Sequence, residues 1–365
     1  MIPPPNAWLR APGPARSSSF FTAEALDEMR RFYADSPMTP LGTLPGLASD
    51  LGLRELIVKD ESSRFDLPAF KIVGVRFATA RLRHGSQLGG QAGGQASGTT
   101  LVAATTGNHG RAVARVAREQ GLGARIYVPR DADPARVAAL RDEGAEVVFV
   151  EEGYDEAVRR MAADAAAHGW TVVSDASWDG YETVPRDIMT GYARIFEEAR
   201  AQWDARPDVV VVQAGVGSLA GAAAGWLAAV FGNDRPRLVI AEPEGSACVM
   251  ASLAAGRRVA LETCARTKMA GLRCAEVSPL AWPVIRDVAD AAVAVTEAQN
   301  DAMIARLAER RGGDQAIAAG PSGGAGLAAL ARVMTEDALA PVRDALGVTH
   351  ASRVMALVTE GTVGA

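Results

Sequence analysis

Short apolar stretches alternate with helical stretches over much of this chain, and this alternation limits the available folds more than any other feature. Between residues 100 and 174 the expected strands are 100–104, 124–128, 146–150 and 171–174, and the expected helices are 110–120, 134–143 and 154–168. After residue 208 the alternation returns, with strands expected at 209–213, 238–242, 291–295 and 354–359. Such alternation with short turns predicts parallel strands covered by helices. We therefore expect an α/β fold with two parallel-sheet lobes.

Two segments mark the passages between the lobes. Residues 85–98 form a glycine- and glutamine-rich linker with few apolar side chains, and residues 185–203 form a long amphipathic stretch. We predict a small domain of residues 86–185, inserted into a large domain made of residues 1–85 and 186–365.

The first sixty residues contain one clear helix signal. Residues 1–20 are rich in Pro, Ser and Arg and are expected to form an extended arm. A helix is expected to begin at Thr22, with one apolar face. That face contains Ala25, Leu26, Met29 and Phe32. The first strand is expected at 51–58.

Composition excludes several classes of protein. Of 365 residues, 48% are hydrophobic and 22% charged, as in ordinary globular proteins. A net charge of -5, with no basic stripe, argues against nucleic-acid binding. The N-terminus lacks the basic start and apolar core of a secretory signal, and no apolar run approaches the ~20 residues of a membrane span. We expect a cytoplasmic protein with no membrane or nucleic-acid partner.

The chain has three cysteines, Cys248, Cys264 and Cys274. They form no CxxC pair and have no histidine at metal-ligand spacing, so no metal site is expected. Three reduced thiols are the simplest interpretation, and a bridge between Cys248 and Cys274 stays open.

Lysine is rare here, which makes Lys71 conspicuous. Only three of 38 basic residues are lysines, and Lys71 lies between Ala69-Phe70 and Ile72-Val73. Arginine stays protonated, whereas a buried lysine amine can become neutral and attack a carbonyl. Lys71 is therefore a candidate for amine chemistry, although a lysine whose stem lies on apolar surface is the alternative. Lys59, beside Asp60 and Glu61, is expected to be a paired surface cation.

A buried strand at 209–213 runs into glycines and then into a helix of small residues at 220–229. The turn between them offers unpaired backbone N–H groups and a helix N-terminus to an anion such as phosphate. The rival interpretation is an NAD-dependent dehydrogenase, because Gly215-x-Gly217-x-x-Ala220 fits a dinucleotide fingerprint and Glu242 ends the next strand. That alternative leaves Lys71 without a task.

The turn Thr105-Thr-Gly-Asn-His109 joins another strand to a helix. There the Asn108 amide can bond a phenolate oxygen while backbone N–H groups hold a carboxylate. Helix capping is the alternative for Asn108. We expect His109 to be structural rather than a base.

These three stretches, in this order, resemble the fold type II family of pyridoxal-phosphate enzymes, in which a smaller α/β lobe is inserted into a larger one. Within that family the chain is most similar to diaminopropionate ammonia-lyase, from about Lys59 onward. The shared motifs are Lys59-Asp-Glu-Ser, Ala69-Phe70-Lys71, Gly107-Asn-His-Gly, Asp175-Ala-Ser-Trp, Ile188-Met-Thr-Gly-Tyr192, Gln213-Ala-Gly-Val-Gly217, Met269-Ala-Gly-Leu272 and Thr359-Glu-Gly361.

The resemblance implies a pyridoxal 5'-phosphate site. Lys71 would form a Schiff base with the cofactor and accept the Cα proton, Asn108 would bond the 3-oxygen, and Thr359 would face the ring nitrogen. The phosphate would be held by the backbone of Gly215, Val216, Gly217, Ser218 and Leu219. A hydroxyl such as that of Thr359, rather than a carboxylate, leaves the ring a weaker electron sink, which favours β-elimination over transamination.

The resemblance also implies a small amino-acid substrate and a homodimer. The substrate carboxylate would be bound by Thr105, Thr106, Gly107 and His109. Asp175 would hold or assist the departure of a cationic β-amino group, with capping of a strand end as the alternative. Ser322 would line the cleft or cap a helix.

The implied reaction is α,β-elimination that gives a 2-oxo acid and ammonia, preferably from 2,3-diaminopropionate. A serine, threonine or 3-hydroxyamino-acid dehydratase is the nearest alternative. An NAD-dependent dehydrogenase and a non-catalytic amino-acid-binding protein are more distant ones.

Thr106 stands where that lyase family typically has an aspartate, a second base on the cofactor face opposite the lysine. A threonine hydroxyl does not ionise near neutral pH, so Lys71 would serve one face alone. We predict turnover of L-substrates with little or none of their D-enantiomers, and gain of D-activity in Thr106→Asp. Assays of both enantiomers of diaminopropionate, serine and threonine check this, and comparable D-turnover by the wild type would contradict it.

Overall fold

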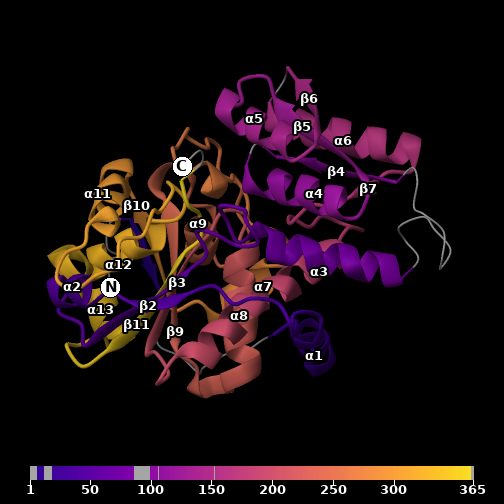
Figure 1. Cartoon of the computed structure of the whole chain (residues 1–365). Coiled ribbons are helices and arrows are strands. Elements are labelled where there is room, and N and C mark those ends of the chain that lie inside the picture. The colour runs from indigo at the N-terminus through magenta and orange to yellow at the C-terminus, as the bar shows by residue number, and fades with distance from the viewer. Residues whose placement is uncertain (1–5, 12–18, 86–98, 106, 152, 363–365) are drawn as a thin grey trace.

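The expected alternation folds into two sheets in separate lobes. The structure, a computed structural model, describes residues 6–11, 19–85, 99–105, 107–151 and 153–362. Figure 1 shows the smaller lobe, with β4 to β7, at the upper right, and the larger lobe below and to the left. The long helices α3, α7 and α8 lie between and beneath them. The two-lobe α/β fold expected from the sequence is confirmed.

The smaller sheet is entirely parallel, in the order β6-β5-β4-β7. Its strands are β4 (Thr100–Ala104), β5 (Gly123–Pro129), β6 (Glu146–Val150) and β7 (Thr171–Val172). The larger sheet has the order β1-β10-β9-β8-β11-β3-β2. Its strands are β1 (Ala7–Leu9), β2 (Leu41–Thr43), β3 (Glu55–Asp60), β8 (Val209–Gln213), β9 (Arg237–Pro243), β10 (Ala291–Val295) and β11 (Arg353–Val358).

The larger sheet departs from the expected parallel arrangement at both edges. β1, from the N-terminal arm, pairs antiparallel with β10, and β2 pairs antiparallel with β3. Short antiparallel strands of this kind commonly border an otherwise parallel sheet.

Helices cover both sheets. They are α1 (Ala23–Phe32), α2 (Pro45–Asp50), α3 (Lys71–His84), α4 (Asn108–Glu119), α5 (Pro134–Asp142), α6 (Tyr154–His168), α7 (Thr183–Gln202), α8 (Ser218–Phe231), α9 (Cys248–Ala255), α10 (Trp282–Val288), α11 (Glu297–Ala308), α12 (Ala325–Thr335) and α13 (Ala340–Leu346). Short 3₁₀ turns occur at Gly232–Asp234, Glu244–Ser246, Ala270–Leu272 and Asp337–Leu339.

The central strand β8 is a continuous apolar run because both of its faces are buried. Val209 and Val211 pack into the core cluster formed with α12 and α13, whereas Val210 and Val212 pack into the cluster formed with α3, α7 and α8. Successive side chains of a strand point to opposite faces, and both faces here are covered.

Two expectations near the N-terminus need correction. Thr22 caps α1 as predicted, by accepting a hydrogen bond from the Ala25 N–H, but Phe32 is exposed and Tyr33 is buried instead. The strand expected at 51–58 begins at Glu55, because the proline-initiated helix α2 precedes it.

The linker predicted at 85–98 lies almost wholly outside the described residues. The division into domains at 86 and 185 therefore stays a prediction. No helix in the described part of the chain is long and apolar enough to cross a membrane.

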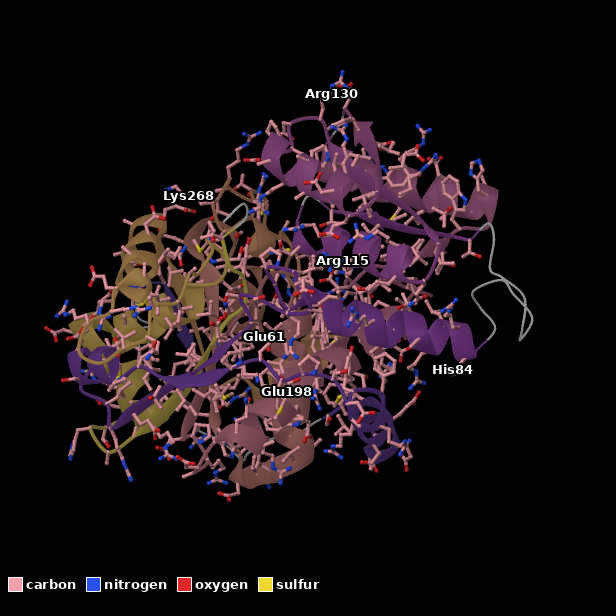
Figure 2. All side chains as sticks on the ribbon, in the orientation of Figure 1. Glu61, His84, Arg115, Arg130, Glu198 and Lys268 are labelled. Carbon is pink, nitrogen blue, oxygen red and sulfur yellow. The ribbon has the colours of Figure 1, made fainter. Side chains whose placement is uncertain are left out.

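Lys59 is not the surface cation expected from its acidic neighbours. Its side chain is 0% exposed, and its Nζ lies 3.0 Å from Glu198 Oε2. Arg64 is also buried and joins Glu198 to Glu61 at 2.7 and 2.6 Å. Figure 2 shows Glu61 and Glu198 near the centre of the molecule, whereas Lys268 lies at its edge. These ion pairs connect helix α7 to the loop that precedes Lys71.

The carboxylate of Glu198 is the centre of this network. Burial opposes its ionisation, but Arg64 and Lys59 lower the pKa of Glu198 to about 2. A pKa below the unfolded value of ~4.3 means that the stabilisation is present above pH ~4.3 and is lost as the pH falls towards 2.

We predict that Glu198→Gln lowers the free energy of unfolding by about 3–5 kcal/mol at pH 7, because it leaves the buried Lys59 without an ion-pair partner among the described residues. Asp27→Asn, which removes an exposed ion pair with Arg30, should cost at most about 0.5 kcal/mol. Urea unfolding at pH 7 and pH 3 measures both variants. A Glu198→Gln cost that is equal at the two pH values would contradict the assignment.

Candidate functional site

The predicted site residues converge at the carboxyl ends of parallel strands. The turn that begins at Thr105 follows β4, Asp175 follows β7, Gly215 follows β8 and Thr359 follows β11. Ligands bind at this edge of open α/β sheets. Chain topology therefore brings together residues that are far apart in the sequence.

Lys71 and Asp175 form an ion pair that joins the start of α3 to the segment after β7. Lys71 is the first residue of α3, and its Nζ donates a hydrogen bond to Asp175 Oδ2. The two side chains are 18% and 15% exposed. Burial opposes ionisation of the carboxyl group, but the positive charge of Lys71 lowers the pKa of Asp175 to about 2. Asp175 is thus ionised at neutral pH.

His109 lies beside this ion pair but adds no charge to it. Its Nε2 lies 2.8 Å from the Val173 carbonyl oxygen, which accepts its hydrogen, while Nδ1 has no hydrogen-bond partner in the described structure. Nδ1 lies 3.9 Å from Asp175 Oδ2. Burial lowers the pKa of His109, so the ring is neutral at pH 7.

Two aromatic rings border the Lys71 ammonium group. Its Nζ lies 5.2 Å from the centre of the Phe70 ring and 5.7 Å from that of Tyr192, distances at which a cation is attracted to a ring face. Tyr192 is fully buried, and its hydroxyl has no partner among the described residues. Tyr192 belongs to a sequence motif shared with the lyase family, but the sequence indicated no role for it, because it lies over a hundred residues from Lys71.

Asn108 has its amide available. It is the first residue of α4, the N-cap is Gly107, and no side chain caps this helix. The capping alternative for Asn108 is therefore wrong. The Thr105 hydroxyl accepts a hydrogen bond from the Gly107 N–H at 3.2 Å, which shapes the turn. Thr106 lies outside the described residues.

The glycine turn after β8 leads directly into an uncapped helix. Gly217 has φ of 91°, in the left-handed region, and α8 begins at the next residue without a side-chain cap. The first N–H groups of such a helix lack partners within it and point at the turn. A Cβ at Gly217 would lie 3.0 Å from Ile285 Cδ1 and 3.1 Å from Val277 Cγ2, so only glycine fits there.

Ser218 and Asp175 are directly linked. The Ser218 hydroxyl donates to the backbone carbonyl oxygen of Asp175. The start of α8 and the segment that carries the ion pair are thus in direct contact.

Thr359 lies in a small polar cluster after β11. Its hydroxyl accepts a hydrogen bond from Gln213 Nε2 at 2.7 Å and donates one to the Ser322 carbonyl oxygen at 3.3 Å. In the sequence Gln213 is part of a shared motif, but nothing near it in the chain indicates that it orients Thr359. The Ser322 hydroxyl accepts from the Gly271 N–H, whereas Gly324 is the N-cap of α12, so the capping alternative for Ser322 is wrong.

Glu242 does not face a ribose. It is buried, and its carboxyl oxygens accept hydrogen bonds from the N–H groups of Val249 and Met250 at 2.8 and 2.7 Å, which hold the start of α9. Burial raises the pKa of Glu242 to about 8. The acid needed by the dehydrogenase alternative is thus engaged elsewhere.

The cysteines are free thiols, so a Cys248–Cys274 bridge is wrong for this structure. Cys248 Sγ lies 3.7 Å from the Gly215 carbonyl oxygen, and a Cβ at Gly215 would lie 3.1 Å from Cys274 Sγ. Both thiols therefore pack around the phosphate-sized turn.

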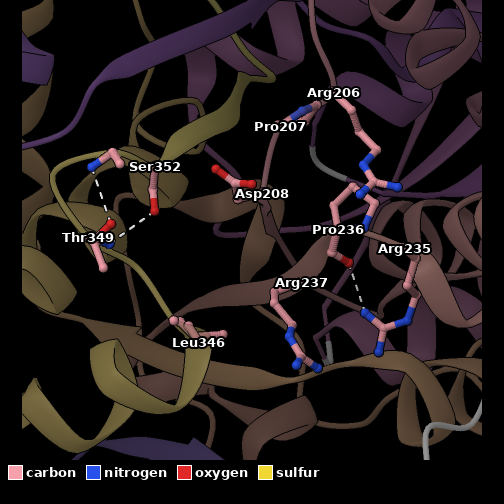
Figure 3. Close-up of a pocket in the computed structure, with 11 residues that line it drawn as sticks. Arg206, Pro207, Asp208, Arg235, Pro236, Arg237, Leu346, Thr349 and Ser352 are labelled. Carbon is pink, nitrogen blue, oxygen red and sulfur yellow. Dashed lines mark hydrogen bonds between the residues drawn. The ribbon is translucent and has the colours of Figure 1, made fainter.

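A cavity of about 380 Å³ lies elsewhere, at the amino ends of β8, β9 and β11. Figure 3 shows Arg206, Arg235 and Arg237 on one side of it and Thr349 and Ser352 on the other. Its arginines are already paired, with Asp234 or Asp290. The cavity is therefore distinct from the site of the predicted residues.

Comparisons with known proteins agree with this geometry. Residues 36–342 match a family described as pyridoxal-phosphate dependent enzyme. Diaminopropionate ammonia-lyase of Escherichia coli K12 is 35% identical over 359 residues, covering 94% of this chain and 90% of that protein. Its Salmonella typhimurium counterpart is 30% identical, covering 96% and 92%. The crystal structure of holo diaminopropionate ammonia lyase from Escherichia coli superposes with a TM-score of 0.88 at 32% identity, covering 98% of this chain and 94% of that one.

We predict that Gly217→Asp abolishes binding of pyridoxal phosphate, because it adds bulk and negative charge where a dianion would lie. Gly217→Ala, which adds bulk alone, should weaken binding less. Fluorescence titration of the two apoproteins measures the affinities, and circular dichroism checks their folding. Normal affinity in folded Gly217→Asp would rule out this turn as the phosphate site.

Proposed function

We propose that this chain, which belongs to the family of pyridoxal-phosphate-dependent enzymes, is an ammonia-lyase that converts 2,3-diaminopropionate into a 2-oxo acid and ammonia. The observation that carries the proposal is the Lys71–Asp175 ion pair. It places an amine and a carboxylate beside a phosphate-sized turn. Relatives with this activity in their names match nearly the whole chain.

The residues present fit the cofactor. Lys71 would hold pyridoxal phosphate covalently, the Asn108 amide, which does not cap α4, would bond its 3-oxygen, and the turn 215–219 would bind its phosphate. Thr359 would lie beside the ring nitrogen with a neutral hydroxyl held by Gln213. When bound, pyridoxal phosphate supplies an electron sink that makes the Cα proton of an amino acid acidic.

The chain's own groups perform the remaining tasks. Backbone N–H groups of the Thr105–His109 turn would bind the substrate carboxylate, and Lys71 would accept the Cα proton. Asp175 would hold the β-amino group in its cationic form, which leaves as ammonia. Elimination is favoured over transamination because Thr359 contributes a hydroxyl rather than a carboxylate.

The assembly and location of the protein are part of the same proposal. Likeness to the lyase family supports a homodimer, and the composition supports a cytoplasmic protein. Sedimentation of the purified protein tests the first point: a monomer at working concentration would contradict it.

We predict that borohydride fixes the cofactor to Lys71, and that peptide mapping leaves Lys59 and Lys268 unlabelled. Lys59 is buried in its ion network, and Lys268 is exposed and paired with Asp301, so neither faces the glycine turn. Lys71→Ala should lower ammonia release from diaminopropionate by about 10³-fold or more, since it removes the proton acceptor.

Lys268→Ala is the matched control and should keep full activity. A label on Lys59 or Lys268 would refute the assignment of Lys71. A wild type that releases oxo acid from serine but not from diaminopropionate would replace the proposal with a hydroxyamino-acid dehydratase.

A further inference from the structure

We propose that Arg136, on α5, is a positioning residue that acts through Glu360 to hold the turn before Asn108 in place. Asn108 and Thr359, which directly precedes Glu360, are the residues proposed to contact the cofactor's 3-oxygen and ring nitrogen. Arg136 thus sets the spacing between these two contacts. The inference rests on the proposed function and adds to it an arginine that no sequence motif indicated.

The first step is that Glu360 is held in place from several sides. Its backbone forms an isolated antiparallel bridge with Ala69, two residues before Lys71. Its carbonyl oxygen accepts a hydrogen bond from the Gly320 N–H at 2.7 Å, and its Oε2 accepts one from the Ser322 N–H at 3.1 Å. A Cβ at Gly320 would lie 3.0 Å from Glu360 Cγ, so the side chain is closely packed there.

The second step concerns the other oxygen of this carboxylate. Glu360 is 2% exposed, and its Oε1 has no hydrogen-bond partner among the described residues. In the same part of the chain, Arg136 is the one basic side chain within 4.0 Å, with its Nη2 3.7 Å from Oε1. Buried carboxylates need a counter-ion, because an unpaired buried charge is costly. Arg136 is therefore the counter-ion of Glu360.

The third step is that the same guanidinium group packs on the turn before α4. A Cβ at Gly107 would lie 3.3 Å from Arg136 Nη1, which is closer than ordinary van der Waals contact. Nη1 thus faces the turn while Nη2 faces Glu360. A planar guanidinium group makes both contacts at once, because its two terminal nitrogens are held in one rigid fork.

The fourth step is that strand pairing does not fix this spacing. The turn at Gly107 follows β4 and Thr359 follows β11, and these strands belong to different sheets. A connection between the two segments must therefore come from side chains. Arg136 and Glu360 supply one, and their burial makes it stronger than an exposed ion pair.

A second ion pair, between Arg266 and Asp131, also joins the segment after α9 to the segment after β5. Its side chains are 74% and 61% exposed. Exposed pairs of this kind contribute little, because water screens them. The connection on which the site depends is therefore the buried one.

The test is a double-mutant cycle on the full-length protein. Arg136→Met removes the charge at similar length, Glu360→Gln removes the charge of its partner, and a third protein carries both changes. Fluorescence titration measures the dissociation constant of pyridoxal phosphate for each. It should rise about tenfold in each single variant and no further in the double variant, because both changes break one connection. Arg130→Met, which removes an exposed arginine paired with Glu151, is the control and should bind as the wild type does.

Hydrogen exchange followed by mass spectrometry gives a local readout that does not depend on turnover. In holoenzyme saturated with pyridoxal phosphate, the backbone N–H groups of residues 107–112 should exchange about tenfold faster in Arg136→Met. Those of α6 should exchange as in the wild type. Arg136→Lys, which keeps the charge but not the fork, should give an intermediate rate at the turn. A general loss of stability would speed exchange in α6 as well.

The outcomes decide between positioning and stability alone. Effects on cofactor affinity that add up in the double variant, or equal acceleration at the turn and in α6, would overturn the inference. Where Glu360→Gln does not fold, the exchange at the turn decides: an unchanged rate in Arg136→Met would overturn the inference. A wild type that releases no ammonia from diaminopropionate would overturn the proposed substrate but not this inference, since affinity and exchange are measured without turnover.

Discussion

One ion pair, between Lys71 and Asp175, organises this protein. The lysine begins α3 and the carboxylate follows β7, so the pair joins segments 104 residues apart in the chain. Its burial makes each charge depend on the other. The Asn108 amide follows β4 of the smaller sheet and the Gly217 turn follows β8 of the larger sheet, each at the carboxyl end of its strand.

A second set of buried charges supports the Lys71–Asp175 ion pair. Glu198 on α7 binds Lys59, at the end of β3, and Arg64, within the loop that leads to Lys71. The Tyr33 hydroxyl donates to the Val73 carbonyl oxygen in the first turn of α3. Gly74 and Gly191 let α3 and α7 approach closely, because a Cβ at either position would clash with the other helix. Lys71 is thus carried by a closely packed support.

Local patterns predicted much of this arrangement. A few neighbouring residues predicted the strand-to-helix turns at Asn108 and Gly215, because backbone N–H groups at a helix start are a local feature. Lys71 was conspicuous because lysine is rare in this chain. Burial of Lys59 was not predictable in this way, since its partner Glu198 is distant in the sequence and its neighbours are acidic. The role of Gln213 was not predictable for the same reason, since its partner Thr359 is distant in the sequence and follows another strand, β11.

The account rests on the claim that the β-nitrogen departs first, as ammonia, from beside Asp175. Single-turnover analysis of diaminopropionate labelled with ¹⁵N at the β-position tests this most directly. We expect labelled ammonia in the first turnover, followed by unlabelled α-ammonia together with the oxo acid, two ammonia per oxo acid in all. Appearance of α-ammonia before β-ammonia, or oxo acid that retains the label, would contradict the account.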